Sequence, residues 1–470
     1  MRIAFLSFEL APVAHVGGLG DVARWLPRML AIADEVVVFA PHHGVLEPGD
    51  GELVPLDVTV EAAELGSVGV STLGETRPGR PTVHLVESPW FDRHDVYTAD
   101  PDEHLRAATL TRGAIELMRE MEWQPDVVHA NDWHTGLAPI HLARVGWGEI
   151  PTVFTIHNLA YQGVFPGDDL GRMGLEWSDG PIGDGGFVNS LATGVAASTL
   201  VTTVSPTYAT EILTPERGEG LDELLRSRQD DLVGILNGIG GEWNPATDPL
   251  IPARFDPEDP TPKADSTDEL RARLGLVESS APIAGVVSRL ADQKGFWLLD
   301  EVLPRLLETG RLQLAVLGTG DPALEEMFAG LAERFPGWAA YHRGFDIGLA
   351  HLVEAGAHLF LMPSRYEPCG LNQMYSLRYG TVPVVHHTGG LVDTVTPWDG
   401  RTGNGFAFSP FGADGLEAAL EEALSVYGDP VTWRRIQAEG MRRDFSWQAR
   451  AAEYRTAYER AIGPMRPSGP

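Results

Sequence analysis

Cysteine is almost absent from this sequence, and long apolar runs are missing altogether. Cys369 is the single cysteine among 470 residues. One thiol excludes a framework of internal disulfides and any metal site built from several thiolates. No segment approaches the roughly 20 consecutive apolar residues that a membrane-spanning helix needs. The remaining composition, 43% hydrophobic and 21% charged, is typical of a globular protein, and the length suits two large α/β domains.

Positive charge is also in short supply. The chain has 35 Lys and Arg residues against 66 Asp and Glu, a formal net charge of -31 at pH 7. So acidic a surface repels nucleic-acid phosphates and anionic lipids, and we expect neither nucleic acid nor a membrane as a partner. Lysine occurs only at Lys263 and Lys294, so each is a candidate for a specific role.

Residues 1–9 resemble a buried strand rather than a signal peptide, and we expect a cytoplasmic protein.

Short β-branched segments alternate with amphipathic stretches, which predicts parallel sheets covered by crossover helices. In the first half the predicted strands are 3–8, 35–39, 82–86, 126–129, 152–156, 200–204 and 232–236. A second series predicts strands at 282–287, 312–317, 359–362 and 382–385, with helices near 295–308, 322–335, 346–355 and 370–379. The fold class is therefore α/β with two doubly wound domains.

Six prolines between residues 240 and 268 separate the two series, and we expect this stretch to hold neither helix nor sheet. The predicted domains are a Rossmann-like domain at 1–240, a second at 241–445 and a terminal helix within 446–470. Ligands of doubly wound sheets bind at the carboxyl ends of the strands, where helix N-termini point. The functional residues should therefore follow strands directly.

In the first half, a glycine turn and two polar clusters follow predicted strands. Gly17 and Gly18 precede a helix, where backbone N–H groups attract anions, although the turn does not match the G-x-G-x-x-G dinucleotide pattern. The polar clusters contain His129, Asp132, His134, His157 and Asn158. Such groups suit hydrogen bonding to a polyhydroxylated ligand. One alternative is that these histidines and Asp132 are metal ligands, although their spacing fits no familiar helical metal motif. Another is that the histidines form hydrogen bonds to backbone carbonyls.

Aromatic residues accompany these clusters. Trp133 and Tyr161 either offer ring faces to a sugar or serve local packing.

In the second half, Arg289 and Lys294 are five residues apart across a turn that follows a strand. A planar guanidinium and an ammonium placed in this way can clamp a pair of phosphates, although an ordinary solvated lysine at a helix start is the simpler alternative. Glu367 precedes a glycine turn and can accept hydrogen bonds from sugar hydroxyls or oppose positive charge at an anomeric carbon. Cys369 lies in that turn without a specified base, so we interpret it as a packed thiol rather than a nucleophile. Gly389-Gly390 forms another turn of the same kind.

Taken together, these motifs resemble those of the bacterial glycogen synthases and plant starch synthases nearly from end to end. The similar segments are 15–19 (a near-match to K-x-G-G-L), 129–136, 154–163, 236–239, 242–248, 288–295, 363–373, 388–395 and 444–447. The resemblance implies a retaining glycosyltransferase with GT-B architecture, in which two Rossmann-like domains face a cleft and a terminal helix packs back on the first. It implies transfer of glucose from ADP-glucose to the nonreducing end of an α-1,4-glucan, with no cofactor and no required metal.

The same resemblance implies roles for individual residues. Arg289 and Lys294 hold the diphosphate, assisted by the glycine turns, while Glu367 holds the donor glucose and His157 bonds the transferred sugar. Those four are the expected catalytic residues. The expected donor-binding residues also include His15, Gly17, Gly18, Asp21, Phe345, Cys369, Gly370, Leu371, Thr388, Gly389 and Gly390. The expected acceptor or sugar-binding residues are Asp132, Asn158 and Tyr161. Phe345 is assigned to the adenine because it lies 22 residues before Glu367.

Two positions depart from the family pattern. His15 replaces the family's lysine, which predicts weaker or more pH-dependent donor binding because imidazole has an ordinary pKa of about 6.5. Gly240 replaces an aspartate, a change that a loop tolerates. The alternatives left open are a GT-B epimerase acting on nucleotide sugars, a noncatalytic glucan-binding relative and, least favoured, a dinucleotide oxidoreductase.

Overall fold

The computed structural model describes residues 1–43, 52–74, 77–92, 95–98 and 100–463. The chain divides into two compact units, each built around its own sheet. Unit 1 comprises Met1–Gly238 with Trp447–Pro470, and unit 2 comprises Ile239–Ser446. Within the described residues, no helix is both long enough and apolar enough to span a membrane.

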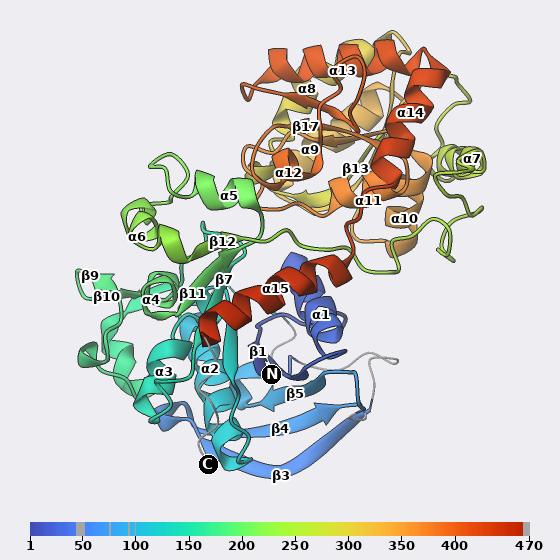
Figure 1. Ribbon diagram of the computed structural model, residues 1–470. Helices are drawn as coiled ribbons and strands as arrows, with labels where there is room; N and C mark the ends of the chain where they lie inside the picture. Colours follow the sequence, from blue (N-terminus) through green and yellow to red (C-terminus); the bar gives the residue numbers. More distant parts are fainter. Residues whose placement is uncertain (44–51, 75–76, 93–94, 99, 464–470) are drawn as a thin grey trace. The chain divides into compact units, whose positions relative to one another are not determined.

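The sheet of unit 1 has the strand order β12-β11-β7-β6-β1-β2-β5-β4-β3 (Figure 1). Its parallel strands are β1 (Arg2–Leu6), β2 (Glu35–Pro41), β5 (Thr82–Glu87), β6 (Val127–Asn131), β7 (Thr152–Ile156), β11 (Leu200–Thr203) and β12 (Leu232–Gly234). All seven were expected. The edge hairpin of β3 (Leu53–Glu61) and β4 (Ser67–Leu73) was not, and its antiparallel pairing corrects the expectation of a purely parallel sheet. One side of β3 faces solvent, so β3 lacks the continuous apolar run of a buried parallel strand.

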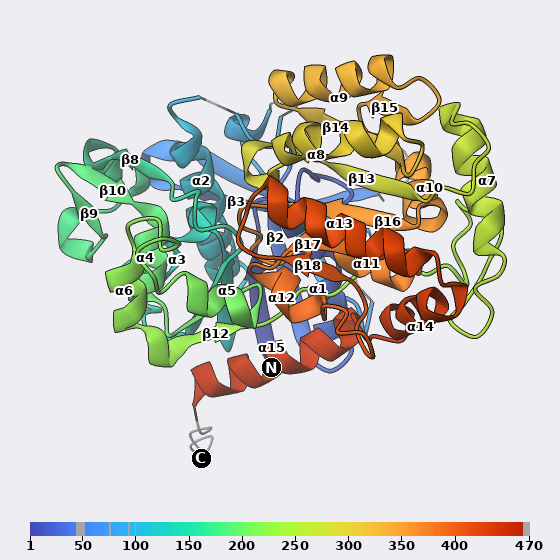
Figure 2. The ribbon, with the colours of Figure 1, turned by 90° about the horizontal axis from the view of Figure 1, so that it is seen from above.

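Helices cover this sheet, and one of them comes from the far end of the chain. The helices of unit 1 are α1 (Gly18–Leu30), α2 (Glu103–Glu120), α3 (Ala138–Arg144), α4 (Ser190–Ala197), α5 (Pro206–Glu211), α6 (Asp222–Ser227) and α15 (Trp447–Ile462). α15 contacts α1 and completes the core on that face of the sheet, as Figure 1 and Figure 2 show. The predicted return of the terminal helix is therefore confirmed. A small sheet of β8 (Val164–Pro166), β9 (Gly183–Asp184) and β10 (Phe187–Asn189) was not predicted.

The sheet of unit 2 is parallel throughout, in the order β15-β14-β13-β16-β17-β18. Its strands are β13 (Ile283–Leu290), β14 (Gln313–Gly320), β15 (Ala339–Arg343), β16 (Leu359–Met362), β17 (Val382–His386) and β18 (Phe406–Phe408). The edge strands β15 and β18 were not anticipated. The helices are α7 (Lys263–Leu274), α8 (Trp297–Glu308), α9 (Pro322–Arg334), α10 (Ile347–Gly356), α11 (Asn372–Arg378), α12 (Gly390–Thr394), α13 (Ala413–Tyr427) and α14 (Pro430–Met441). Two apolar clusters, one with α8, α9, α13 and α14 and the other with α7, α10 and α12, form its core.

The stretch 240–268 departs from expectation at its end. Helix α7 begins at Lys263, inside the segment that we expected to hold no helix. The reason is positional: Pro262 is the N-cap of α7, and proline is tolerated there because the first N–H groups of a helix need no partner within it.

Candidate functional site

Three neighbouring strands of unit 1 bring polar residues to one edge of its sheet. Strands β7, β6 and β1 are adjacent and parallel, so their carboxyl ends meet. His157 directly follows β7, Asp132 directly follows β6, and Glu9 follows β1. The expectation from sequence placed the first two there; Glu9 was not among the expected site residues.

Asp132 and His157 are tied to each other and to the sheet. The His157 N–H donates to Asp132 Oδ1 over 2.7 Å, and His157 Nε2 lies 2.9 Å from Asn131 Oδ1. Asn131 Nδ2 donates to the Leu6 carbonyl at 2.9 Å, which turns its Oδ1 toward the imidazole. His157 therefore carries its proton on Nε2 and keeps Nδ1 as an acceptor.

The backbone and the ionisation of this pair are both unusual. Asp132 has φ 55° and ψ 179°, a region that is essentially reserved for glycine and costs about 1–3 kcal/mol. Burial raises the pKa of Asp132 to about 7, against the opposing effect of backbone N–H groups from His157 and Asn158. Burial lowers the pKa of His157 to about 3, so its imidazole is neutral at pH 7. Strain and a displaced carboxyl pKa in one place are typical of a functional site.

The glycine turn lies beside this edge and already holds an anion. Glu9 Oε2 accepts the N–H groups of Val16 at 3.0 Å and of Gly17 at 2.8 Å. Gly17 caps α1, which begins at Gly18. In the same turn His15 Nε2 lies 3.4 Å from Asp21 Oδ2, and this contact raises the pKa of His15. The structure thus brings together the four residues expected in the turn (His15, Gly17, Gly18 and Asp21) and adds Glu9.

The remaining expected residues of unit 1 differ in exposure. Asn158 Oδ1 accepts the N–H of Ala160 and thereby closes a local turn. Tyr161 is 55% exposed, so its ring is available to a ligand. Trp133 instead stacks on His134 at 3.8 Å and packs against Gly163, where a Cβ would approach its ring to 2.2 Å. Of the two readings of Trp133, local packing is the one that the structure supports.

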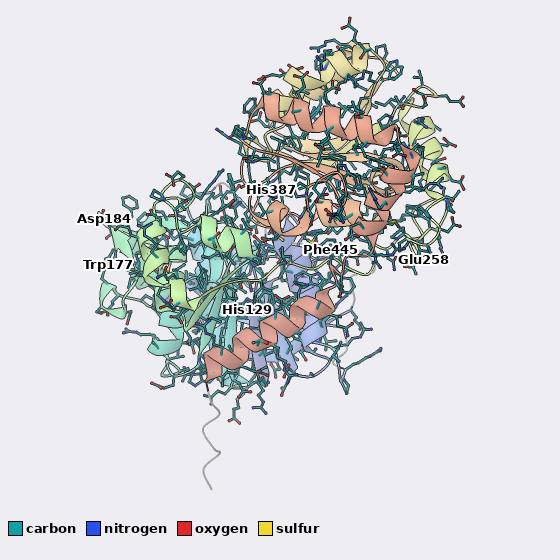
Figure 3. All side chains as sticks on the ribbon, turned by 45° about the horizontal axis from the view of Figure 1, so that its top comes forward. His129, Trp177, Asp184, Glu258, His387 and Phe445 are labelled. Carbon is teal, nitrogen blue, oxygen red and sulfur yellow. The ribbon has the colours of Figure 1, made fainter. Side chains whose placement is uncertain are left out.

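The other histidines of these clusters are interior residues. His129 bonds Tyr458 of α15 through Nδ1 and Thr155 through Nε2, at 2.7 and 2.6 Å, beneath the terminal helix (Figure 3). His134 is buried and stacks on Phe8 at 4.4 Å. In the part of the chain that the structure describes, no three His, Cys, Asp or Glu side chains gather as metal ligands. Neither histidine bonds a backbone carbonyl, the simpler alternative, among the described residues.

Three neighbouring strands of unit 2 form a corresponding edge. Strands β13, β16 and β17 are adjacent, and the segments after them contain Lys294, Glu367 and Gly390. Lys294 Nζ donates to Glu367 Oε2 at 2.6 Å, and the Gly390 N–H donates to the Glu367 carbonyl at 3.0 Å. This ion pair was not foreseen: sequence reasoning assigned Lys294 to phosphate and Glu367 to sugar without pairing them.

The two cations of the expected clamp are in different states. Arg289 lies near the end of β13, is exposed and forms no ion pair with any described residue. Lys294 lies in the 3₁₀ turn Asp292–Lys294 rather than at the start of α8, which begins at Trp297. Glu367 is only 4% exposed, and Ser364 Oγ also donates to its Oε2 at 2.9 Å. This edge therefore carries one buried, paired carboxylate and one exposed guanidinium.

Close backbone packing explains the glycines around Glu367. A Cβ on Gly390 would lie 2.2 Å from the Cys369 carbonyl, and one on Gly295 would lie 2.1 Å from the Pro363 carbonyl. Gly370 and Gly389 have positive φ values of 72° and 47°. The Cys369 thiol is buried, as expected of a packed side chain. Leu371 is the N-cap of α11, and Thr388 follows the end of β17.

Phe345 lies apart from these contacts. It follows β15, the strand on the far side of β14 from β13, and it is 79% exposed. Sheet order places it near the end of β14, because the neighbouring Gly344 N–H donates to the Gly318 carbonyl of that strand. Its ring is open to a planar ligand, which is compatible with the expected stacking.

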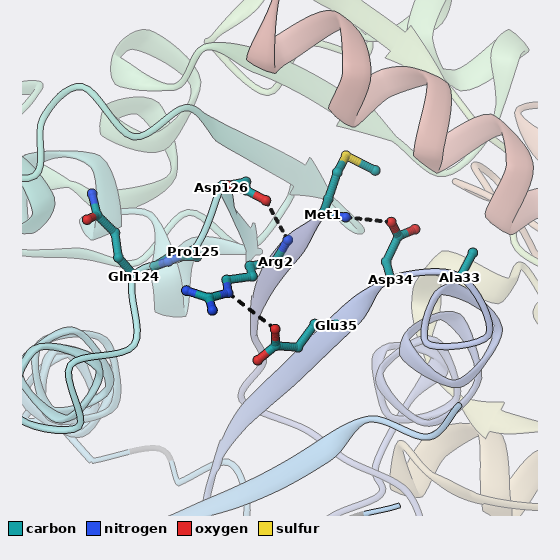
Figure 4. A pocket seen from close by; sticks show the side chains of 8 residues that line it. All are labelled: Met1, Arg2, Ala33, Asp34, Glu35, Gln124, Pro125 and Asp126. Atoms are coloured by element: carbon teal, nitrogen blue, oxygen red, sulfur yellow. Dashed lines mark hydrogen bonds and ion pairs between the residues drawn. The ribbon is translucent and has the colours of Figure 1, made fainter. Parts of the chain in front are cut away.

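A pocket of about 540 Å³ lies at the opposite edge of the sheet of unit 1 (Figure 4). Its lining residues are Met1, Arg2, Ala33, Asp34, Glu35, Gln124, Pro125 and Asp126. Asp34 and Glu35 are already paired there with the Met1 ammonium and with Arg2. This edge carries the amino ends of the strands, where ligands of doubly wound sheets do not bind, so the pocket is not the candidate site.

Comparison with known proteins identifies the family of both halves of the chain. Residues 2–227 match the starch synthase catalytic domain, and residues 267–438 match the glycosyl transferases group 1 domain. The chain is 45% identical to a glycogen synthase of Myxococcus xanthus over 97% of this chain and 99% of that one. It is also 45% identical to a glycogen synthase of Anaeromyxobacter dehalogenans over 99% of this chain and 100% of that one.

Solved structures give the same result. The catalytic domain of starch synthase IV from Arabidopsis thaliana, bound to ADP and acarbose, superposes with a TM-score of 0.90 at 34% identity, covering 98% of this chain and 99% of that one. A sucrose-phosphate synthase from Thermosynechococcus elongatus, at 16% identity and a TM-score of 0.63 over 98% of each chain, shares the fold alone. The predicted GT-B fold is confirmed, and the chain belongs to the glycogen and starch synthase family of glycosyltransferases.

Proposed function

We propose that this protein transfers glucose from ADP-glucose to the nonreducing end of an α-1,4-glucan, with retention of the anomeric configuration. The observation that carries the proposal is the arrangement of Arg289, Lys294 and Glu367 at one sheet edge, in a chain 45% identical to glycogen synthases over nearly its whole length. The Arabidopsis relative was solved with ADP and acarbose, which supports a nucleoside diphosphate and a carbohydrate as ligands. A cytoplasmic location remains a prediction from the sequence.

In this proposal unit 2 binds the nucleotide sugar. Arg289 and Lys294 neutralise the departing diphosphate, which is the main source of stabilisation when charge develops on a phosphoryl leaving group. Glu367 holds the donor glucose, and its ion pair with Lys294 couples the position of the sugar to that of the diphosphate. The turns at Cys369–Leu371 and Thr388–Gly390 supply backbone groups, and Phe345 stacks on the base.

Unit 1 supplies the residues of the acceptor side. His157 Nδ1 accepts a hydrogen bond from a hydroxyl of the transferred glucose, because the Nε2–H group already donates to Asn131 Oδ1. Asp132, Asn158 and Tyr161 contact the sugar or the incoming glucan. No protein nucleophile is required: the acceptor hydroxyl attacks from the face that the diphosphate leaves, and the leaving phosphate accepts its proton. A glucosyl adduct trapped on Glu367 would contradict this front-side mechanism.

The direct test measures nucleotide release and product from two donors. We expect ADP release from ADP-glucose, dependent on added glycogen, with glucose units added to the primer and little release of UDP from UDP-glucose. An epimerised sugar nucleotide without primer extension would indicate an epimerase. Binding of maltooligosaccharide without ADP release would indicate a noncatalytic relative.

Replacement of Lys294 tests whether this residue stabilises the departing diphosphate. We expect Lys294→Ala to lower kcat by about 10²–10³, the usual cost of one donor to a developing negative charge. Arg435→Ala, on the surface of α14, is the matched control and should leave kcat unchanged, since its neighbour is Trp398 rather than a site residue. Retention of full turnover by Lys294→Ala would remove Lys294 from the proposed clamp.

A further inference from the structure

Glu9 occupies a position that an anion-binding turn normally keeps for its ligand. Glu9 is 3% exposed, and both of its carboxylate oxygens accept hydrogen bonds. Oε2 accepts the N–H groups of Val16 and Gly17, and Oε1 accepts the hydroxyl of Tyr97 at 2.5 Å. The backbone of Glu9 is fixed as well, since Ser7 Oγ donates to its carbonyl at 2.6 Å.

This arrangement is too specific to be an incidental helix cap. The carboxylate does not belong to a residue of the turn but reaches it from the end of β1, eight positions away from Gly17. It also packs closely on α1: a Cβ on Gly20 would lie 3.2 Å from Glu9 Oε2 and 2.8 Å from His15 Cδ2. Burying a charge is costly unless hydrogen bonds satisfy it, and here three donors do so. Glu9 thereby determines the shape of the segment that contains His15.

The charge of Glu9 reaches the other ionisable groups of this edge. It raises the pKa of His15 and also that of Asp132. The groups that act on His15 are Asp21 and Glu9, which raise its pKa, and Arg24, which lowers it. A single buried carboxylate therefore influences both the glycine turn and the sugar-binding edge.

We propose that Glu9 is a positioning residue for donor binding: by holding the Val16 and Gly17 N–H groups, it fixes the turn that presents His15 and Gly18 to the diphosphate of the donor. The inference rests on the proposed function. It also changes one assignment, because the Gly17 N–H belongs to Glu9 and not to the diphosphate.

The test compares ADP binding and turnover in the wild type with Glu9→Gln, which removes the charge at constant size. Asp429→Asn is the matched control, since Asp429 caps α14 through the Val431 N–H without contacting the site. We expect Glu9→Gln to raise the Kd for ADP and the KM for ADP-glucose by about tenfold and to change kcat less. We also expect the pH at which ADP affinity declines to move lower, because His15 loses a neighbouring negative charge.

The variant Glu9→Asp separates the effect of side-chain length from the effect of charge. It also provides the test if Glu9→Gln does not fold. It keeps the carboxylate but shortens the side chain, so the Kd for ADP should stay raised while the pH profile returns toward that of the wild type. ADP affinity and pH profile equal to those of the wild type in both variants would overturn the proposal. So would tighter ADP binding by Glu9→Gln, which would make Glu9 a competitor of the diphosphate. Failure of the proposed function is seen separately, as a wild-type protein that neither binds ADP nor consumes ADP-glucose.

Discussion

At the scale of single residues, the replacement of the family's lysine by His15 has an electrostatic consequence. A lysine in this turn would keep its charge across the physiological pH range, whereas an imidazole loses it near neutrality. The structure moderates this difference: the hydrogen bond that His15 donates to Asp21 and the nearby charges of Asp21 and Glu9 raise the pKa of His15 and favour its cationic form. The turn therefore keeps a cation at low pH and loses it as the pH rises.

The resulting prediction concerns the pH dependence of donor binding. As the pH rises through the raised pKa of His15, the positive charge near the diphosphate is lost, and the affinity for ADP should fall. His15→Lys should abolish this fall, since lysine stays protonated to about pH 10. Titration calorimetry with ADP between about pH 6 and about pH 9 measures both profiles. Identical profiles would show that His15 does not act on the diphosphate.

At the scale of secondary-structure elements, Lys263 ties two helices of unit 2 together. Its ammonium is buried and donates to the carbonyls of Ala355, at 2.6 Å near the end of α10, and of Tyr379, at 3.1 Å just after α11. It also donates to Thr381 Oγ1 at 2.7 Å. The carbonyl ends of helices attract cations, and the last carbonyls lack partners within the helix. The two lysines of the chain thus divide their roles: Lys263 stabilises the fold, and Lys294 belongs to the candidate site.

We accordingly predict different main defects for the two lysine variants, in stability for Lys263 and in turnover for Lys294. Lys263→Met should lower the Tm strongly, because each buried acceptor left without a donor costs about 1–3 kcal/mol. Lys294→Met should lower the Tm less, since Lys294 is partly exposed and the Glu367 carboxylate keeps the hydrogen bond from Ser364, but it should lose turnover. Calorimetric melting and ADP-release assays on both variants check the contrast. An equal loss of Tm in the two would argue against the helix-capping role of Lys263.

At the scale of the whole molecule, unit 1 is completed by a segment from the other end of the chain. The side chains of α15 that are buried against the rest of unit 1 are Trp447, Ala451, Tyr454, Ala457 and Tyr458. The hydroxyl of Tyr458 lies 2.7 Å from His129 Nδ1, a contact between residues 329 positions apart. Removal of this helix would expose the apolar face of α1 and of the central strands, so the stability of unit 1 depends on the end of the chain.

Truncation after Ser446 should therefore destabilise unit 1 rather than unit 2. We expect limited proteolysis to cleave the truncated chain first within 1–238, and mass spectrometry of the fragments identifies the site. Tyr458→Phe, which removes only one hydrogen bond, is the matched control and should cost about 1 kcal/mol. First cleavage within 239–446 would contradict the prediction.

Local patterns in the sequence determined the main elements of both sheets. Strand and helix periodicity is a property of short windows, so most of the parallel strands, the terminal helix and the glycine turns could be recognised without tertiary contacts. The hairpin β3–β4 and the edge strands β15 and β18 were not predicted, because β3 is half-exposed and β15 and β18 are short, so these edge strands lack the strong apolar pattern of central ones.

Only the tertiary structure decided which side chains meet. The pairs Glu9–Gly17, Lys294–Glu367 and Lys263–Ala355 are separated by 8, 73 and 92 residues. Such pairing depends on strand order and on how closely the backbones approach, which a local pattern of residue types does not encode even for the pair that is eight residues apart. The residue types of the candidate site could be predicted from the sequence. The strained backbone of Asp132, the Glu9 carboxylate held in the glycine turn and the burial of Lys263 instead follow from packing. The physical reason is that a charge is buried only where the fold supplies its partners.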